Sequence, residues 1–271
     1  MKNFKTVRTA IFAMAMSLGM AVFACTPANS ENEKATKKNQ ELETLVKAHV
    51  KEANIVFKKG KVIEIAYASV LGGKEAQLNQ EYFAKILPLA AEYGGKMLGS
   101  LQVTAVVDGE MSPQMIAIFE WPEIAARDKL LADERAQKLF PIRDEALTFI
   151  KLAYFTVEED VTVKFREDKT YEFFNAWLTP EAETALPEYF KQSDAPKKKY
   201  GPPVFVASLK PVELPAADYL VQPHMTGIVE WSSTNAYYGL MADPEFQKAL
   251  PLLKKSITRL DGLHAKFNFP E

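Results

Sequence analysis

The chain contains a second copy of part of itself, and this internal repeat constrains the fold more than any other feature. Met115–Trp121 (MIAIFEW) returns as Met225–Trp231 (MTGIVEW), at a shift of 110 in the numbering. At the same shift, segments 115–141 and 225–251 are identical at 11 of 27 aligned positions. A period of this length is typical of a duplicated domain, because solenoid units repeat about every 20–50 residues. The sequence therefore predicts two tandem copies of one fold, although the repeat does not reveal a reaction.

Residues 1–24 are typical of an export signal and not of a folded segment. Three basic residues precede an apolar run at 10–23, which is too short to span a bilayer comfortably. The run ends at Ala24-Cys25, which resembles a bacterial lipobox, and Cys25 is the single cysteine. The resemblance implies a lipid on Cys25 and a membrane partner. Thr26 then favours the outer membrane, facing the periplasm. An ordinary signal peptide that ends at a cysteine by chance is the alternative.

Charge and cysteine content exclude several functions. Without the signal, Lys+Arg falls from 33 to 30 while Asp+Glu stays at 35, so the net charge is about −5. An acidic exported protein has no electrostatic basis for binding nucleic acid. One cysteine allows no intrachain disulfide, and His49, His224 and His264 lack the spacing of metal ligands. We expect no metal and no cofactor.

Segment 25–54 is predicted to be a tether followed by a short docking helix. Residues 26–40 are polar and charged, and cannot bury enough surface to fold alone. Apolar residues then recur at helical spacing between Glu41 and Ala53. We expect repeat one at 55–160 and repeat two at 161–271.

Each repeat is predicted to have the order β-α-β-β-α-β, which is the ferredoxin-like split motif. Repeat one has expected strands at 61–70, 98–107, 115–121 and 152–157, and a helix at 78–93 that Gly94-Gly95 ends. Repeat two has expected strands at 171–178, 204–209, 225–231 and 263–269. Its first helix is less regular because 194–199 is a poor helix former. Lys197–Lys199 are expected to form a solvated loop, with a binding patch as the alternative. Asp133 and Asp243 are expected to be helix N-caps.

The predicted strands are apolar on both faces, so each sheet needs a second cover. In 115–121, Met115, Ala117, Phe119 and Trp121 point one way and Ile116 and Ile118 the other. The simplest cover for the bare face is the other repeat. The predicted fold class is therefore α+β, with two tandem ferredoxin-like β-α-β-β-α-β repeats packed sheet to sheet as an intramolecular pseudo-dimeric α/β barrel. We expect a monomer, because the second repeat replaces a dimer partner.

Three short motifs carry a family resemblance. They are Tyr93-Gly94-Gly95, Glu120-Trp121-Pro122 and the helix that begins Ala126-Arg127. With these motifs the chain resembles the dimeric α/β-barrel superfamily, and within it the uncharacterised domain-of-unknown-function family 1330. That family is distantly related to antibiotic-biosynthesis-type monooxygenases. The resemblance implies a fold more than an activity. The Asn–Trp–His set of related haem-degrading enzymes is incomplete here, since Asn175 and Trp231 have no histidine near Met241.

Candidate site residues follow from the strand pattern. Glu120 and Glu230 each lie beside a tryptophan on a strand, where an apolar environment would raise the pKa of a carboxylate and make it a base. A solvated or ion-paired carboxylate is the alternative, with Arg127 as a partner for Glu120. If the barrel binds a ligand, its lining is expected to include five further residues: Tyr67, Trp121, Asn175, Trp177 and Trp231.

The leading functional hypothesis is an envelope-anchored lipoprotein that binds a small apolar or aromatic molecule in a barrel pocket. The first alternative is a cofactor-free monooxygenase or isomerase of the dimeric α/β-barrel type. The second is an envelope interaction protein without catalytic activity. An enclosed cavity would favour the first two, and a filled sheet interface would favour the third.

Overall fold

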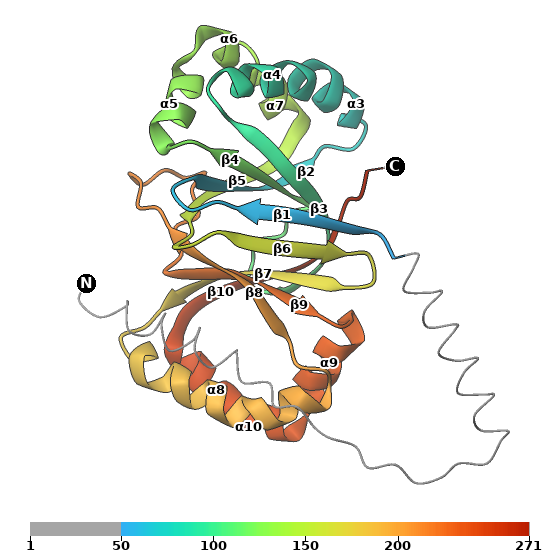
Figure 1. Cartoon of the computed structure of the whole chain (residues 1–271), viewed down its shortest axis with the longest axis vertical. Helices are drawn as coiled ribbons and strands as arrows, with labels where there is room; N and C mark the ends of the chain where they lie inside the picture. Colours follow the sequence, from blue (N-terminus) through green and yellow to red (C-terminus); the bar gives the residue numbers. More distant parts are fainter. Residues whose placement is uncertain (1–49, 271) are drawn as a thin grey trace, which may run out of the picture.

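The structure, a computed structural model, describes residues 50–270, in which eight strands close a barrel that both repeats share (Figure 1). Residues 1–49, with the predicted signal, Cys25 and most of the tether, lie outside the described residues. Repeat one contributes β2 (Val62–Val70), β3 (Lys96–Asp108), β4 (Met115–Trp121) and β5 (Leu147–Thr156). Repeat two contributes β7 (Thr170–Leu178), β8 (Val204–Pro211), β9 (Met225–Trp231) and β10 (Ile257–Phe267).

The two repeats have the same strand order and join edge to edge. The orders are β3-β4-β2-β5 in repeat one and β8-β9-β7-β10 in repeat two, with antiparallel neighbours throughout. β10 pairs with β3 from Gly262 to Phe267, and β5 pairs with β8 only at Phe155 and Thr156. This pseudo-twofold closure confirms the predicted α+β fold class and the intramolecular barrel.

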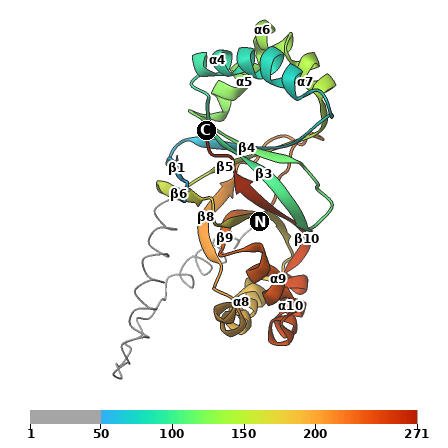
Figure 2. The same ribbon diagram turned by 90° about the vertical axis from the view of Figure 1, so that its right-hand side faces the viewer.

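The helices cover the outer faces of the barrel and form the two ends of the molecule (Figures 1 and 2). Repeat one has α3 (Glu75–Gln77), the π-helical η1 (Leu78–Phe83), α4 (Ala84–Glu92), α5 (Ile124–Ala132), α6 (Glu134–Gln137) and α7 (Phe140–Ala146). Repeat two has α8 (Ala182–Lys199), α9 (Thr234–Ala242) and α10 (Pro244–Ser256). None of the described helices is long and apolar enough to cross a membrane.

The barrel interior is a packed hydrophobic core. Alternate residues of β2 and β4 point inward, so Ile65, Ile116 and Ile118 pack against Tyr171 and Phe173 of repeat two. These five side chains are at most 2% exposed. The outer-face residues of the same strands pack instead under the helices, in a separate cluster for each repeat. The strands are therefore apolar on both faces because both faces are buried.

Two strands that the sequence analysis did not predict cover one mouth of the barrel. β1 (Glu52–Phe57) and β6 (Val161–Arg166) precede the first barrel strand of their repeats and pair with each other antiparallel. Phe57 and Phe165 are fully buried in the barrel core. Glu52 and Ala53, expected at the end of a helix, belong to β1 because the alternation of Ile55 and Phe57 fits a strand that covers the core.

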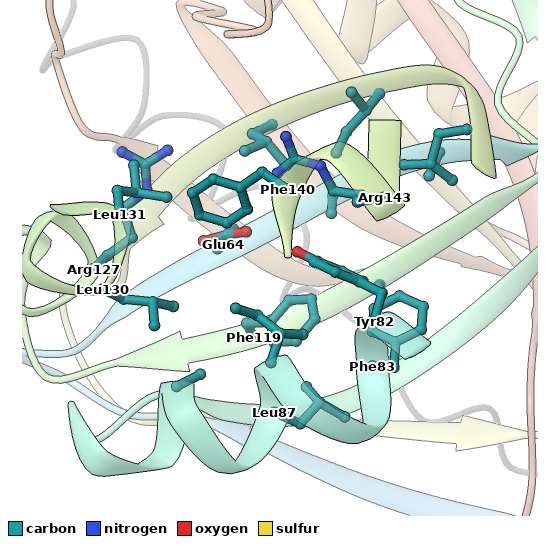
Figure 3. A pocket seen from close by; sticks show the side chains of 18 of the residues that line it. Glu64, Tyr82, Phe83, Leu87, Phe119, Arg127, Leu130, Leu131, Phe140 and Arg143 are labelled. Carbon is teal, nitrogen blue, oxygen red and sulfur yellow. The ribbon is translucent and has the colours of Figure 1, made fainter. Parts of the chain in front are cut away.

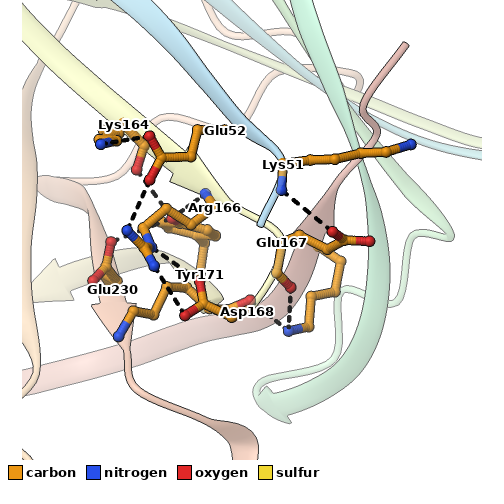
Figure 4. Close-up of polar contacts among 10 residues, drawn as sticks. Lys51, Glu52, Lys164, Arg166, Glu167, Asp168, Tyr171 and Glu230 are labelled. Atoms are coloured by element: carbon orange, nitrogen blue, oxygen red, sulfur yellow. Dashed lines mark hydrogen bonds and ion pairs between the residues drawn. The ribbon is translucent and has the colours of Figure 1, made fainter. Parts of the chain in front are cut away.

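Ion pairs line the outer side of this two-stranded ribbon (Figure 4). Glu52 on β1 accepts from Lys164 at 2.6 Å and from Arg166 at 2.7 Å, both on β6. Arg166 also contacts Asp168 at 2.9 Å. Exposed pairs of this kind contribute at most about 1 kcal/mol each. The buried aromatic side chains of β1 and β6 therefore stabilise the ribbon more than its ion pairs do.

The lysine-rich end of α8 corrects one prediction. Lys197–Lys199 form the last turn of α8, whereas a solvated loop was expected, and the poor helix former 194–199 is helical throughout. Its charges suit a helix end, because Lys198 pairs with Asp194 one turn earlier at 2.7 Å and cations in the last turn complement the helix dipole. The ammonium of Lys197 lies 4.8 Å from the centre of the Tyr189 ring, so this lysine packs on the repeat-two core.

Asp133 and Asp243 cap helices as predicted. The Asp133 carboxylate accepts from the backbone N–H of Arg135, and that of Asp243 from Glu245 and Phe246. Each carboxylate also accepts a tyrosine hydroxyl from its own repeat: Tyr93 at 2.8 Å in repeat one and Tyr200 at 3.0 Å in repeat two. In both copies, a tyrosine at the end of the first helix thus binds the aspartate that caps a later helix.

Candidate functional site

A cavity of about 120 Å³ lies in repeat one, between the outer face of the sheet and the helices (Figure 3). Its wall is mostly aliphatic and aromatic, and five of its residues carry carboxyl, hydroxyl or guanidinium groups: Glu64, Tyr82, Arg127, Arg143 and Tyr154. An apolar pocket into which a few polar groups converge is the usual form of a small-molecule site. A volume of this size is close to that of the roughly 150 Å³ apolar cavities that accept one benzene ring.

Small residues on the outer sheet face create the cavity. Ala66 on β2 lies directly opposite Ala117 on β4, and both line the space. The equivalent cross-strand pair in repeat two is Phe174 and Gly227. A Cβ at Gly227 would lie 2.6 Å from the Phe205 ring and 3.1 Å from that of Phe174. Aromatic rings therefore fill in repeat two the volume that two alanines leave open in repeat one.

Glu64 is the carboxylate of this cavity. β2 turns Glu64 to the outer face between Val62 and Ala66, and one carboxylate oxygen accepts a hydrogen bond of 2.9 Å from the Trp121 indole N–H. Burial among apolar side chains raises the pKa of Glu64, because the charged form loses its hydration. The positive charge of Arg127 and the Trp121 hydrogen bond oppose the shift without cancelling it. Glu64 is thus a carboxyl group whose affinity for a proton is raised by a largely apolar wall.

Tyr154 and Arg127 complete the polar end of the cavity. Tyr154 on β5 is the cross-strand neighbour of Glu64 and is 3% exposed. Its hydroxyl lies near Glu64 and Arg127, but it makes no well-formed hydrogen bond within the described residues. The guanidinium of the buried Arg127 lies 4.9 Å from the centre of the Tyr154 ring and pairs with Asp128 at 3.1 Å. Burial raises the pKa of Tyr154, so its hydroxyl stays protonated and is available as a donor.

Tyr82, Phe140 and Arg143 come from the helices and line the other side of the cavity. In Figure 3, Tyr82 on η1 turns its hydroxyl toward the middle of the space, and Phe140 and Arg143 on α7 lie across from it. The Arg143 guanidinium lies 4.9 Å from the Phe140 ring centre and pairs with the exposed Asp144 at 2.7 Å. The cavity therefore holds one carboxylate, two hydroxyls and two guanidinium groups among apolar walls.

The motifs noted in the sequence meet behind this site. Gly94, with a φ of 78°, ends the helix after Tyr93, and a Cβ there would lie 2.6 Å from Pro122. A Cβ on Gly95 would lie 2.5 Å from the Trp121 ring. The two glycines are needed because the chain passes closely over Trp121-Pro122. They position the indole that binds Glu64.

Repeat two carries an equivalent arrangement with different chemistry. Glu172 accepts a hydrogen bond of 2.7 Å from the Trp231 indole. Burial raises the pKa of Glu172 to about 7, with the Trp231 bond and the charge of Lys197 opposing the shift. His264 takes the place of Tyr154, is fully buried, and packs on Tyr237 with ring centres 4.5 Å apart. Tyr237 in turn takes the place of Arg127 at a shift of 110.

The structure separates the site residues predicted from sequence into three places. Glu120 and Glu230 lie on the barrel side of β4 and β9 at the end that β1 and β6 cover, and Glu230 accepts from the Tyr171 hydroxyl at 3.2 Å. Arg127 pairs with Asp128 and not with Glu120. The other five predicted site residues lie in two further regions. Trp121 and Trp231 lie on the outer faces beneath the helices, whereas Tyr67, Asn175 and Trp177 lie on the inner face toward the other barrel mouth.

Sequence reasoning missed Glu64, Tyr154 and their repeat-two equivalents. A signal was present, because Glu64 interrupts the apolar face Val62, Ala66 and Ala68, and Glu172 interrupts the matching face of β7 in repeat two. A charge at the same place in two diverged copies marks a maintained position. Among residues 50–270, no three His, Cys, Asp or Glu side chains converge in a way that could hold a metal ion.

Comparison with known proteins supports the fold. Residues 68–153 match the family described as domain of unknown function DUF1330. No curated protein matches the sequence. Among solved structures, an anthrone oxidase-like protein is 14% identical over 80% of this chain and 95% of its own, with a TM-score of 0.50.

Two further solved structures cover a similar share of the chain with lower similarity. A provisionally assigned monooxygenase from Lactobacillus acidophilus NCFM is 13% identical over 77% of this chain and 94% of its own, with a TM-score of 0.41. A chlorite dismutase variant from Candidatus Nitrospira defluvii is 10% identical over 76% and 92%, with a TM-score of 0.45. The segment that matches DUF1330 contains most of the cavity lining and lies in repeat one of the intramolecular α/β barrel.

Proposed function

We propose that the cavity of repeat one binds a small, mostly apolar molecule that carries one hydroxyl or similar polar group. The observation that carries this proposal is that Glu64, Tyr154 and Arg127 meet at one end of an otherwise apolar wall. A ligand hydroxyl at that end would donate to Glu64 and accept from Tyr154, whose hydroxyl makes no well-formed hydrogen bond within the described residues.

The pocket of the proposal lies under the helices and not inside the barrel. The barrel core is filled by side chains from both repeats, which by itself would suit an interaction protein without a ligand. The cavity beneath α4 and α7 favours a binding function instead, because apolar surface is left accessible there.

Binding is tested with p-cresol and toluene, which share an aromatic ring and differ by the hydroxyl. Titration by ligand-observed NMR is expected to show that p-cresol binds at least tenfold more tightly than toluene. Glu64→Gln is expected to remove most of that difference in affinity. The double variant Ala66→Phe/Ala117→Gly copies the pair found in repeat two and is expected to abolish binding of both compounds while the protein stays folded. Equal affinities of the double variant and the wild type would exclude this cavity as the site.

A second candidate function is proton abstraction, which the raised pKa of Glu64 favours. In a cofactor-free oxygenation, Glu64 would remove a proton from an activated C–H or O–H group, and the resulting carbanion or phenolate would react with O₂. Hydroquinone, whose single ring suits the volume of this cavity, is the probe, and its oxidation by one O₂ yields benzoquinone and hydrogen peroxide. Oxygen consumption that Glu64→Gln abolishes and the control Glu120→Gln retains would support catalysis. Consumption that persists at the wild-type rate in Glu64→Gln would rule out Glu64 as the base.

Membrane anchoring through a lipid on Cys25 is part of the same proposal. Its support is the resemblance of residues 1–25 to a lipoprotein signal. Expression of the full chain in a Gram-negative host with an alkyne-labelled fatty acid is expected to label the protein and direct it to the outer membrane fraction. Cys25→Ser is expected to remove the label. Labelling that persists in the variant would contradict attachment at Cys25.

A further inference from the structure

A second cavity, of about 220 Å³, lies at the barrel mouth opposite the one that β1 and β6 cover. Its walls come from both repeats: Phe149 and Lys151 on β5, Trp177 on β7, Arg259 on β10, and Glu110, Met111, Leu220 and Val221 from two loops. β5 and β10 are four strands apart in the eight-stranded barrel, so this cavity crosses the mouth beneath the loops. It is separate from the repeat-one cavity, which lies on the outer face of the sheet.

The repeat symmetry places this cavity on the pseudo-twofold axis. At a shift of 110, Glu110 corresponds to Leu220, Met111 to Val221 and Phe149 to Arg259, and all six residues line the space. Only the apolar pair Met111 and Val221 keeps its character. The other two pairs join a charged residue with an apolar one, so the cavity has different chemistry on its two sides.

Two cations face the barrel side at this mouth. Arg259 is fixed by a fully buried carboxylate, because Asp261 accepts from its Nη2 at 2.7 Å and from its Nε at 3.2 Å. The same guanidinium lies 4.4 Å from the centre of the Trp177 ring. Lys151, half-buried on the opposite wall, donates to the backbone carbonyl of Asp218. Its charge has no carboxylate partner among the described ion pairs.

We infer that this barrel mouth is a second ligand site, for a small aromatic carboxylate. The carboxylate group would lie between Lys151 and Arg259, where it would give Lys151 the anionic partner that it lacks among the described ion pairs. The ring would pack against Phe149 and Trp177, which form the aromatic part of the wall. Glu110 is exposed at the rim, where water screens its repulsion of an anion. Charge-assisted contacts and aromatic packing act together on such a ligand.

Benzoate is the probe, with benzyl alcohol as the uncharged comparator of similar size. Binding is followed by tryptophan fluorescence, because Trp177 lies at this mouth and Trp121 and Trp231 lie under the helices. Benzoate at millimolar concentration is expected to change the tryptophan emission of the wild type. Its affinity is expected to be more than tenfold higher than that of benzyl alcohol. Trp177→Phe is expected to remove the spectral response.

The charge contribution is tested with Lys151→Met, which is expected to weaken benzoate binding at least tenfold. Lys254→Met, an exposed lysine on α10, is the matched control and is expected to leave it unchanged. Because Arg259→Met alone would leave Asp261 buried without its partner, Arg259→Met/Asp261→Asn tests the second cation. The repeat-one variant Ala66→Phe/Ala117→Gly is expected to bind benzoate normally.

Three results would overturn the inference. They are the absence of benzoate binding to the folded wild type, equal affinities of wild type and Lys151→Met, and loss of benzoate binding in the Ala66→Phe/Ala117→Gly variant. The third would assign the anion to the repeat-one cavity. Failure of p-cresol binding alone would leave this site unaffected, because its lining residues are different.

Discussion

Tyr154 and His264 occupy equivalent positions in the two repeats, and each places buried polar atoms that make no well-formed hydrogen bond within residues 50–270 beside a partly buried glutamate. Tyr154 is the cross-strand neighbour of Glu64, and His264 that of Glu172. Duplication has therefore preserved the place of the acid and its tryptophan donor, while the neighbouring group changed from a phenol to an imidazole. The two sites are expected to respond differently to pH.

Glu172→Gln is expected to make the free energy of unfolding less dependent on pH between pH 4.5 and 7. The pKa of Glu172 rises from 4.5 to about 7 on folding, so the native state holds a proton that the unfolded state has lost. In the wild type this contribution is complete below pH 4.5 and is lost as the pH rises to about 7, a change on the order of 3 kcal/mol. Urea denaturation at several pH values measures it.

Glu183→Gln is the matched control, because Glu183 is exposed on α8. It is expected to leave the pH dependence unchanged. A Glu172→Gln protein with the wild-type pH profile would show that this carboxylate ionises as freely in the native state as in the unfolded chain.

His264→Met is expected to stabilise the protein, most strongly at acidic pH. Burial lowers the pKa of His264 to about 4, so the unfolded state binds a proton that the native state does not. Wild-type stability is therefore lost as the pH falls from 6.5 toward 4, and the variant removes that loss. It also removes two unpartnered nitrogens, and a gain of about 1–2 kcal/mol is expected at pH 7.

The comparison for this prediction is His224→Met. His224 accepts a hydrogen bond of 2.9 Å from the backbone N–H of Leu178, so its loss is expected to destabilise the protein slightly. Thermal melts at pH 5 and pH 7 distinguish the two histidines. Destabilisation by His264→Met at both pH values would mean that the imidazole makes a favourable polar contact.

Gly95→Ala is expected to destabilise repeat one by about 1–3 kcal/mol, because the new methyl group would lie 2.5 Å from the buried Trp121 ring. The indole must move, and its hydrogen bond to Glu64 is expected to lengthen or break. Thermal denaturation and near-ultraviolet circular dichroism measure both effects. Gly72→Ala is the control, since no atom lies within 4 Å of the added Cβ. Equal melting temperatures for the two variants would contradict the close packing.

Phe174→Ala is expected to open in repeat two the cavity that repeat one already has. Phe174 is 8% exposed and packs on Phe205 with ring centres 5.8 Å apart. Truncation of a buried phenylalanine costs about 3–5 kcal/mol, and the new space is expected to bind toluene. Urea denaturation and ligand-observed NMR measure the two effects. A cost below about 1 kcal/mol would mean that the surrounding side chains collapse into the space.

Much of the fold follows from local sequence. The internal repeat predicts the duplication, and the two-faced apolar strands predict that each sheet needs a second cover, because exposed apolar surface on both faces would be unstable in water. The caps at Asp133 and Asp243 follow from their own side chains and their neighbours. β1 and β6 were not predicted, since short strands that pair between distant parts of the chain have no local signal beyond alternation.

The candidate sites depended on the tertiary structure. The strand pattern of the sequence determined that Glu64 lies on one face of β2, but the packing of the helices decided that this face encloses a cavity. Repeat one holds the cavity because it has Ala66 where repeat two has Phe174. Closure of the barrel likewise brought Trp177 and Lys151 to one mouth from different repeats. Periodicity encodes the direction of a side chain, whereas burial, desolvation and long-range pairing arise only when distant segments pack together.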